Sequence, residues 1–224
     1  MSTLTSPPLA PLLAQLFEES EVTKKVLIDR MGKLSKGDRG ALMSSTDPFE
    51  LYSAAKDIHL AISQATGNLL YILATGIRAR YIIEFGTSFG VSTLHMAAAL
   101  RDNGGGQLIS TEFEPSKIIR ARDCIARAGL LDLVELREGD ALHTLGSDLP
   151  AAVDLLFLDG AKQHYRPILG MIEPFLRNGA LVIADNADGA PEYLQHVRHS
   201  CGYISTAFND LELSVRLMGV KKAG

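Results

Sequence analysis

Residues 81–90 read Tyr81-Ile-Ile-Glu-Phe-Gly-Thr-Ser-Phe-Gly90, and this stretch decides the predicted fold. Its apolar start is typical of a buried strand, and Gly86 and Gly90 predict a turn that leads into a helix from about Ser92. Because glycine has no Cβ atom, such a turn lets a ligand approach the backbone closely. The spacing Gly-x-x-x-Gly differs from the Gly-x-Gly-x-x-Gly of dinucleotide folds, which argues against a nicotinamide cofactor.

Strands and helices are predicted to alternate downstream of this turn. The apolar runs predict strands at residues 107–111, 134–137, 153–158 and 180–184, and helices at 115–128, 141–146, 165–176 and 191–199. The pair Asn178-Gly179 is predicted to turn the chain into the strand at 180–184. Two last strands, 203–208 and 211–217, flank Asn209-Asp210 and predict a hairpin. The fold class is therefore α/β: a doubly wound, seven-stranded, mostly parallel sheet with an antiparallel C-terminal hairpin.

The N-terminal third is predicted to be mainly helical. Residues 1–10 are expected to be frayed because their prolines discourage a helix, and a helix is predicted over 11–31. A loop over 33–45, a helix that opens at Asp47-Pro48 and a helix over 67–75 complete this part. We expect residues 1–75 to form a helical cap on the substrate side of a core at 76–224, within a single domain.

Bulk composition narrows the function classes. The chain has 224 residues, of which 46% are hydrophobic and 21% charged, as in ordinary soluble globular proteins. Its net charge of −4 argues against nucleic acid as a partner, since phosphate binding needs a basic face. No apolar run is long enough to span a membrane, and the N-terminus lacks the basic start of a secretory signal. Two widely spaced cysteines are expected to be reduced and buried, and the protein is expected to be cytoplasmic.

Polar side chains follow two of the predicted strands at the point where each strand ends. Asp159 follows the run 155–158, and Asp185 with Asn186 follows 180–184. Ligands of open parallel sheets bind at the carboxyl ends of the strands, so these side chains are expected to share one site. Two carboxylates and an amide suit Mg²⁺ or another divalent cation. Lys162 lies three residues after Asp159, and His164 is a competing candidate for a base.

Acidic residues also follow two other strands. Glu112 ends the second strand, where a carboxylate commonly accepts hydrogen bonds from ribose hydroxyls. Glu114 is a competitor that could instead be a solvated charge at the start of a helix. Asp140 precedes Ala141 after the third strand, where the pair could meet an adenine ring or Asp140 could cap the next helix. Both roles of Asp140 are compatible.

These motifs resemble a known family. The run from Ile82 to Thr93 is similar to the first motif of class I S-adenosylmethionine-dependent methyltransferases. Phe157-Leu-Asp-Gly-Ala-Lys-Gln-His-Tyr165 and Ala184-Asp-Asn186 resemble the cation-dependent O-methyltransferases, which include catechol and caffeoyl-CoA O-methyltransferases. The stretch from Gly189 to Arg198 is particularly similar to the catechol enzyme. The resemblance extends from about residue 60 to the end and implies a Rossmann-like methyltransferase fold.

The resemblance implies roles for eleven residues. Lys162 matches the general base, and the metal ligands would be Asp159, Asp185 and Asn186. Glu84 and Gly86 would lie along the methionine part of the cofactor, and Glu112 would hold its ribose. The cofactor-binding residues would be Ser63, Glu84, Gly86, Ser92, Glu112, Asp140, Ala141 and Asp159. The implied cofactors are S-adenosylmethionine and Mg²⁺ or another divalent cation.

One departure concerns the acceptor. The catechol enzyme has His and Trp where this chain has Gly160 and Ala161, so the resemblance implies a roomier acceptor pocket. The expected substrate is a small hydroxylated molecule, an aromatic compound with adjacent hydroxyls. The alternatives are a sugar or larger natural product, an NAD(P)-dependent oxidoreductase, or a cofactor-binding module without catalysis. A homodimer through the apolar N-terminal helix is a further expectation.

Overall fold

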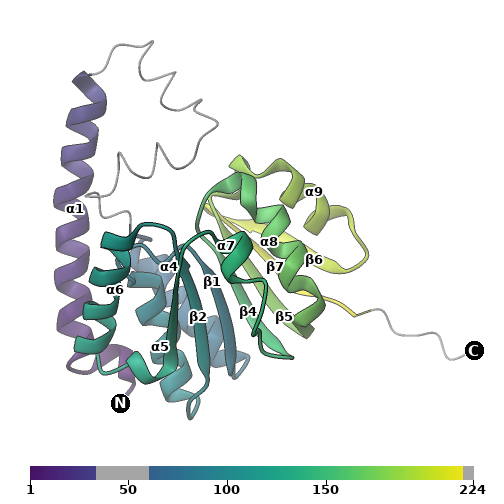
Figure 1. Ribbon diagram of the computed structural model, residues 1–224, viewed down its shortest axis with the longest axis horizontal. Helices are drawn as coiled ribbons and strands as arrows, with labels where there is room; N and C mark the ends of the chain where they lie inside the picture. Colours follow the sequence, from purple (N-terminus) through teal and green to yellow (C-terminus); the bar gives the residue numbers. More distant parts are fainter. Residues whose placement is uncertain (34–60, 219–224) are drawn as a thin grey trace, which may run out of the picture.

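The computed structural model describes residues 1–33 and 61–218, with side chains left out for 27–33, and shows a layered α/β arrangement (Figure 1). Within these residues the helices are α1 (Leu9–Lys33), α4 (Gln64–Gly76), α5 (Val91–Asp102), α6 (Pro115–Arg127), α7 (Ala141–Thr144), α8 (Tyr165–Ile172) and α9 (Pro191–His199). The strands are β1 (Tyr81–Phe85), β2 (Gln107–Glu112), β3 (Val134–Glu138), β4 (Val153–Leu158), β5 (Leu176–Asp185), β6 (Tyr203–Phe208) and β7 (Leu211–Arg216). The helix predicted to open at Asp47-Pro48 lies outside the described residues.

The strands form one seven-stranded sheet in the order β3-β2-β1-β4-β5-β7-β6. The first five are mutually parallel, and β7 runs antiparallel to both β5 and β6. The sheet therefore confirms the predicted class and the C-terminal hairpin. Chain order reverses between β1 and β4, and such a switch point opens a crevice at the carboxyl ends of the strands.

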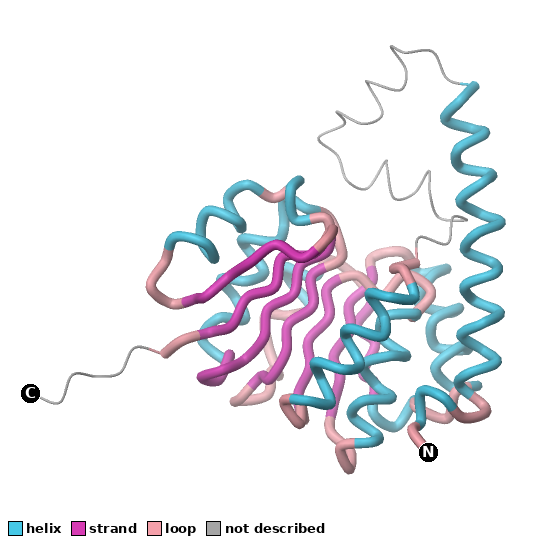
Figure 2. The backbone as a smooth tube through the Cα atoms, turned by 180° about the vertical axis from the view of Figure 1, so that it is seen from behind, coloured by secondary structure: helices cyan, strands magenta, loops and turns pink. Residues whose placement is uncertain are grey.

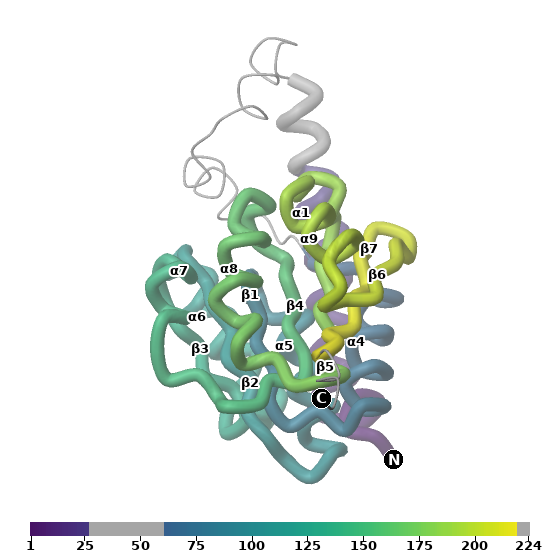
Figure 3. Tube along the Cα trace, turned by 90° about the vertical axis from the view of Figure 1, so that its right-hand side faces the viewer, coloured from purple at the N-terminus to yellow at the C-terminus, as the bar shows by residue number. Residues whose placement is uncertain are grey.

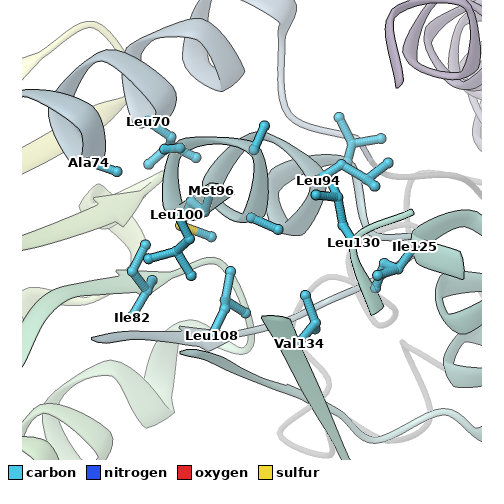
Figure 4. Packing of buried hydrophobic residues seen from close by; sticks show 14 of the residues in the cluster. Leu70, Ala74, Ile82, Leu94, Met96, Leu100, Leu108, Ile125, Leu130 and Val134 are labelled. Atoms are coloured by element: carbon cyan, nitrogen blue, oxygen red, sulfur yellow. The ribbon is translucent and has the colours of Figure 1, made fainter. Parts of the chain in front are cut away.

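Successive side chains of each central strand face opposite layers of helices. Ile82 and Leu108 belong to a cluster with α1, α4, α5 and α6, and Figure 4 shows side chains of the α4 and α5 layer above them. Ile83 and Ile109 belong to the other cluster, with α7, α8 and α9. Figure 2 shows these layers from behind, with α1 beside the sheet and extending past it, and Figure 3 shows the molecule from a third side. Packing on both faces holds the strands in place, and so positions the strand ends that form the site.

The N-terminus is ordered, contrary to the prediction that residues 1–10 are frayed. The backbone N–H of Thr3 donates to both carboxylate oxygens of Asp102, at 3.1 and 3.0 Å, and Tyr71 donates its hydroxyl to the same carboxylate at 2.6 Å. A short 3-10 turn covers Thr3–Thr5, and α1 begins at Leu9, whose side chain is fully buried. Pro11 is tolerated because it lies in the first turn of the helix.

The link from α8 to β5 also differs from its prediction. The helix ends at Ile172, a 3-10 turn with Pro174 follows, and β5 runs from Leu176 without a separate turn at Asn178-Gly179. The register shifts between Val153 and Leu155, so Asn178-Gly179 lies in an irregularity of the strand, where Gly179 has φ +78°. Asn178-Gly179 does interrupt the regular strand pairing, as its turn propensity suggests. The residues on either side of it pair with β4, so it stays within β5.

A buried carboxylate joins the start of β1 to β4. Asp154 accepts hydrogen bonds from the backbone N–H groups of Arg80 and Tyr81, at 2.7 and 2.8 Å. Its other oxygen accepts from Nε of Arg177 at 2.5 Å. This ion pair satisfies two backbone donors at the amino-terminal edge, opposite the end where the strands deliver their polar residues.

No helix among the described residues has the length and apolar character needed to cross a bilayer. Both cysteines are free thiols, of which Cys124 is buried as expected but Cys201 is exposed.

Candidate active site

A cavity of about 390 Å³ lies at the carboxyl ends of β1, β2, β4 and β5. Eight of the eleven residues singled out in the sequence line it, although they come from separate parts of the chain: Gly86, Glu112, Asp140, Ala141, Asp159, Lys162, Asp185 and Asn186. The other three, Ser63, Glu84 and Ser92, are not among its described lining residues. The parallel sheet brings the eight together because all of them follow the strands at one edge.

Lys162 is held at the β4 end of the cavity by two hydrogen bonds. Its Nζ atom donates to the hydroxyl oxygen of Tyr165 at 2.6 Å and to the backbone carbonyl oxygen of Asp185 at 2.9 Å. The nearest carboxylate oxygen, Oδ1 of Asp159, lies 3.8 Å away. Burial lowers the pKa of Lys162, although the charges of Asp159 and Asp185 oppose this shift. The lysine is therefore fixed in place at the edge of the cavity.

Asp159 and Asp185 are close enough to disturb each other's ionisation. Burial raises the pKa of Asp159 well above its ordinary value, and the charge of Asp185 raises it further. The pKa of Asp185 is also raised, chiefly by burial. Two neighbouring carboxylates that resist joint ionisation form a place where a cation would be stabilised.

Asn186 places a neutral amide beside the two carboxylates. Its backbone has the left-handed φ of 48°, its backbone N–H donates to the carbonyl oxygen of Asp210 at 2.7 Å, and its side-chain amide nitrogen donates to the Asp185 carboxylate. In the part of the chain that is described, no cluster of three or more His, Cys, Asp or Glu side chains forms a metal site. The donor set is two carboxylates and one amide, which fits a hard divalent cation.

The glycine turn brings the end of β1 against the end of β4. The N–H of Asp159 donates to the carbonyl oxygen of Phe85 at 2.8 Å. Gly86 has φ +101°, and a Cβ atom there would lie 2.4 Å from the carbonyl oxygen of Asp159. No side chain fits at this position, so Gly86 is required for the strands to meet beneath the cavity.

The structure separates the roles of Glu112 and Glu114. Glu112 lines the cavity, and its two oxygens accept from the N–H groups of Ser88 and Glu114, at 2.8 and 3.0 Å. Glu114 is instead the N-cap of α6. The position of Asp140 is compatible with both expected roles. It caps α7 by accepting from the N–H of Leu142 at 2.9 Å, and it also lines the cavity.

Glu84 and Ser92 lie beneath the cavity and contact each other. The Glu84 carboxylate is fully buried and accepts hydrogen bonds from the hydroxyls of Ser92, Thr93 and Ser110, the last two at 2.6 and 2.5 Å. Burial raises its pKa, while the three hydroxyls oppose the shift. This carboxylate joins β1 and β2 to the first turn of α5, and so supports the glycine turn from below.

Ser63 has a structural contact of its own. It is the N-cap of α4 and accepts from the N–H of Thr66 at 3.0 Å. Its neighbours Ala61 and Ile62 line the cavity instead. The sequence motif therefore pointed to the right segment of chain, and the fold turns the two preceding residues toward the cavity.

Phe85 fills the space beside Gly160, while the roomier acceptor pocket stays a prediction. A Cβ atom on Gly160 would lie 2.5 Å from two carbons of the Phe85 ring. The ring stacks on His164, with centroids 6.3 Å apart and planes 13° apart, and meets Tyr165 edge-on. An aromatic wall is thus present at this side of the cavity, but it comes from β1 and from the segment after β4.

The contributors to the site that the sequence analysis missed include Phe85, Lys117, Tyr165 and Lys24. Tyr165 follows Lys162 by three residues, so its place beside the lysine has a sequence signal in that spacing. Lys117 lies in the first turn of a helix, where a cation is unfavourable, and this anomaly was also readable. Phe85 and Lys24 gave no such signal, because only packing turns them toward the cavity.

Comparison with known proteins matches the methyltransferase domain family over residues 83–187. Catechol O-methyltransferase B of Danio rerio is 32% identical over 198 residues, which cover 84% of this chain and 73% of that protein. Catechol O-methyltransferase of Mycobacterium tuberculosis is 33% identical over 133 residues, 59% of this chain and 60% of that protein.

A solved structure gives the same result at the level of the fold. The O-methyltransferase TomG of Streptomyces achromogenes, which is involved in tomaymycin synthesis, was crystallised with S-adenosylmethionine. It is 26% identical, superposes with a TM-score of 0.63, and the match covers 89% of this chain and 99% of TomG. The Rossmann-like methyltransferase fold is thereby confirmed. By its fold, its first-motif turn and its similarity to the zebrafish enzyme, the chain belongs to the class I S-adenosylmethionine-dependent O-methyltransferases.

Proposed function

We propose that this enzyme is a Mg²⁺-dependent O-methyltransferase that methylates one oxygen of a small aromatic acceptor with adjacent hydroxyls, with Lys162 as the general base. The observation that carries the proposal is the position of Lys162. Its Nζ atom lies 3.8 Å from the Asp159 carboxylate, in a cavity that Asp185 and Asn186 also line. A base, two carboxylates and an amide therefore meet at one point.

The cofactor would occupy the part of the cavity bounded by the ends of β1, β2 and β3. Glu112 would accept from the ribose hydroxyls, since the N–H groups of Ser88 and Glu114 already orient its two oxygens. Asp140 and Ala141 would face the adenine, and Gly86 the methionine part. Ser63, Glu84 and Ser92 would act through the segments that they hold. S-adenosylmethionine supplies the electrophilic methyl group.

The chain's own residues account for the proton and for orientation. A phenol has a pKa of about 10, so it is a weak nucleophile at neutral pH until its proton is removed. Lys162, whose pKa is lowered by burial, would take that proton. The O–CH₃ bond then forms as the S–CH₃ bond breaks, and the sulfur keeps the electron pair. Tyr165 and the Asp185 carbonyl oxygen hold Lys162 in position for this step.

Asp159, Asp185 and Asn186 would hold the divalent cation. Two carboxylates and one amide match the oxygen preference of Mg²⁺, and a cation would stabilise the charged forms of the two aspartates, whose pKa values burial raises. The bound ion would supply Lewis-acid stabilisation of the acceptor oxygen. The same three residues would orient an acceptor whose two adjacent oxygens face the site.

The acceptor class follows from the aromatic wall and from the relatives. Phe85 and His164 stack at one side of the cavity and offer a flat surface to a planar ring. The zebrafish and mycobacterial relatives are both named for catechol, which is a vicinal diol. TomG is involved in tomaymycin synthesis, so a larger natural product is the alternative acceptor.

The N-terminal segment would border the acceptor side. Lys24 of α1, together with Ala61 and Ile62 before α4, lines the cavity, which supports a cap formed by residues 1–75. Pairing of two chains through the N-terminal helix and a cytoplasmic location stay predictions.

The test is methyl transfer from labelled S-adenosylmethionine to catechol, caffeate and a polyhydroxylated flavonoid, with Mg²⁺ or with EDTA. Lys162→Met is expected to lower turnover at least 100-fold with little change in S-adenosylhomocysteine affinity, as for loss of a general base. Lys25→Met, which removes an exposed lysine, is the matched control. Full activity in EDTA, or in Lys162→Met, would refute the metal or the base assignment respectively.

A further inference from the structure

We propose that Lys117 is a cofactor-binding residue that donates a hydrogen bond to a ribose hydroxyl, so that Glu112 and Lys117 grip the ribose diol from two sides. The inference rests on the proposed cofactor position and goes beyond it, because neither the family motifs nor the expected site contains this lysine. It starts from an ammonium group for which the described residues, 1–33 and 61–218, provide no hydrogen-bond or ion-pair partner.

Lys117 is only 3% exposed, yet it lines the cavity. Among the described residues, none forms a hydrogen bond or ion pair with its ammonium group. Lysine is almost never buried without a partner, because removing its charge from water costs free energy. A hydrogen-bond acceptor bound in the cavity would offset this cost.

The position in the helix makes the cation still less favourable for folding alone. Glu114 caps α6, and Lys117 is the third residue of the helix, where the dipole disfavours positive charge by about 0.3–1 kcal/mol. A residue that breaks local rules of both burial and helix charge is expected at a functional position. The cavity supplies that function, since Lys117 faces it.

The chemistry of the neighbouring groups identifies the ligand. Glu112 lines the same cavity, and its two oxygens are oriented by backbone N–H groups rather than by Lys117. A carboxylate is only an acceptor and an ammonium only a donor, whereas a hydroxyl is both. A vicinal diol between them satisfies each group, because it donates to Glu112 and accepts from Lys117. The ribose of the cofactor is such a diol.

Calorimetric titration tests the contact with three probes: S-adenosylhomocysteine, 5′-methylthioadenosine, and the 2′,3′-dideoxy form of 5′-methylthioadenosine. The proteins are wild type, Lys117→Met, Lys117→Gln and the exposed control Lys25→Met. Lys117→Met is expected to bind the first two probes about 10-fold more weakly, as for loss of a charged hydrogen bond. The affinity of Lys117→Met for the dideoxy probe should be within twofold of the affinity of wild type for the same probe. Lys117→Gln keeps a hydrogen-bond donor, so its affinity for S-adenosylhomocysteine should lie between those of wild type and Lys117→Met.

Thermal unfolding provides a readout that a purely structural lysine would not give. Without ligand, Lys117→Met should melt at the same or a higher temperature, because it removes an unpaired buried charge. With saturating S-adenosylhomocysteine, its stabilisation should be smaller than that of wild type. A lower melting temperature without ligand together with unchanged affinity would show that Lys117 is structural.

The inference is overturned if Lys117→Met binds S-adenosylhomocysteine within twofold of wild type, or if it loses the same factor for the dideoxy probe. If Lys117→Met fails to fold, Lys117→Gln decides the matter with the same two comparisons. Failure of the proposed function is a separate result, because wild-type protein would then bind no S-adenosylhomocysteine or transfer no methyl group.

Discussion

The Nζ atom of Lys162 lies 2.6 Å from the hydroxyl oxygen of Tyr165, and both groups donate to the backbone carbonyl oxygen of Asp185. This triangle joins the segment after β4 to the end of β5. Tyr165 is fully buried, so the lysine is held by a rigid partner. The position of the proposed base therefore depends on a residue that would touch neither cofactor nor acceptor.

Tyr165→Phe removes one of the two hydrogen bonds of Lys162 and preserves the ring. We expect kcat to fall about 10-fold, on the scale of a hydrogen bond to a charged group, while S-adenosylhomocysteine affinity stays unchanged. Steady-state kinetics with separate kcat and KM values, together with calorimetry, measure this. An unchanged kcat would mean that the Asp185 carbonyl oxygen alone positions the lysine.

Three buried carboxyl groups should each make the metal-free protein less stable as pH rises from the acid side. The pKa values of Asp159, Asp185 and Glu84 are raised by burial, so each folded-state carboxyl keeps its proton when the unfolded one, with a pKa of about 4, has lost it. The stability from these groups is fully present below that value and is lost as pH rises through the folded pKa values. Denaturation in EDTA from pH 4 to 7 measures the slope.

Mg²⁺ should reverse this loss, because it binds the deprotonated carboxylates. The increase in melting temperature on adding Mg²⁺ should therefore be larger at pH 7 than at pH 5. Asp159→Asn should remove most of the response, and Asp188→Asn, a nearby exposed change, should keep it. An equal Mg²⁺ response at both pH values would argue against a site formed by these carboxylates.

Gly160→Ala should strain the protein through Phe85, because the new Cβ would lie 2.5 Å from two ring carbons. We expect about 1–3 kcal/mol of destabilisation, as is typical of overpacking. Phe85→Leu in the same chain should recover part of this loss, since the smaller side chain leaves room. Chemical denaturation of the two single variants and the double variant gives the coupling, and strict additivity would contradict the contact.

Asp154→Ala should destabilise the sheet far from the cavity. The change leaves the N–H groups of Arg80 and Tyr81 and the guanidinium of Arg177 without their acceptor. The expected cost is about 1–3 kcal/mol for the backbone donors left without an acceptor, because the Arg177 side chain is 35% exposed and its charge is partly solvated. Urea denaturation measures it, with kinetics of the remaining folded protein as the control: KM and kcat should stay close to those of wild type.

Much of the architecture was readable because the signals are local. The apolar runs at β1 and β4 and the Asn209-Asp210 hairpin were predicted at or near their observed bounds. The errors arose where distant contacts override local preference. Asp102 orders the N-terminus from 99 residues away, and pairing with β4 retains Asn178-Gly179 within β5.

The residues of the candidate site also fall into those that local sequence features predicted and those that only tertiary contacts revealed. The sequence by itself determined that Asp159, Lys162, Asp185 and Asn186 follow strand ends, because side-chain chemistry and spacing are local properties of the chain. Only the tertiary structure decided that Phe85 fills the space beside Gly160, that Glu84 lies below the cavity, and that Lys117 faces it. These relationships depend on how the strands and helices pack, since close approach between residues far apart in sequence is set by the shared core.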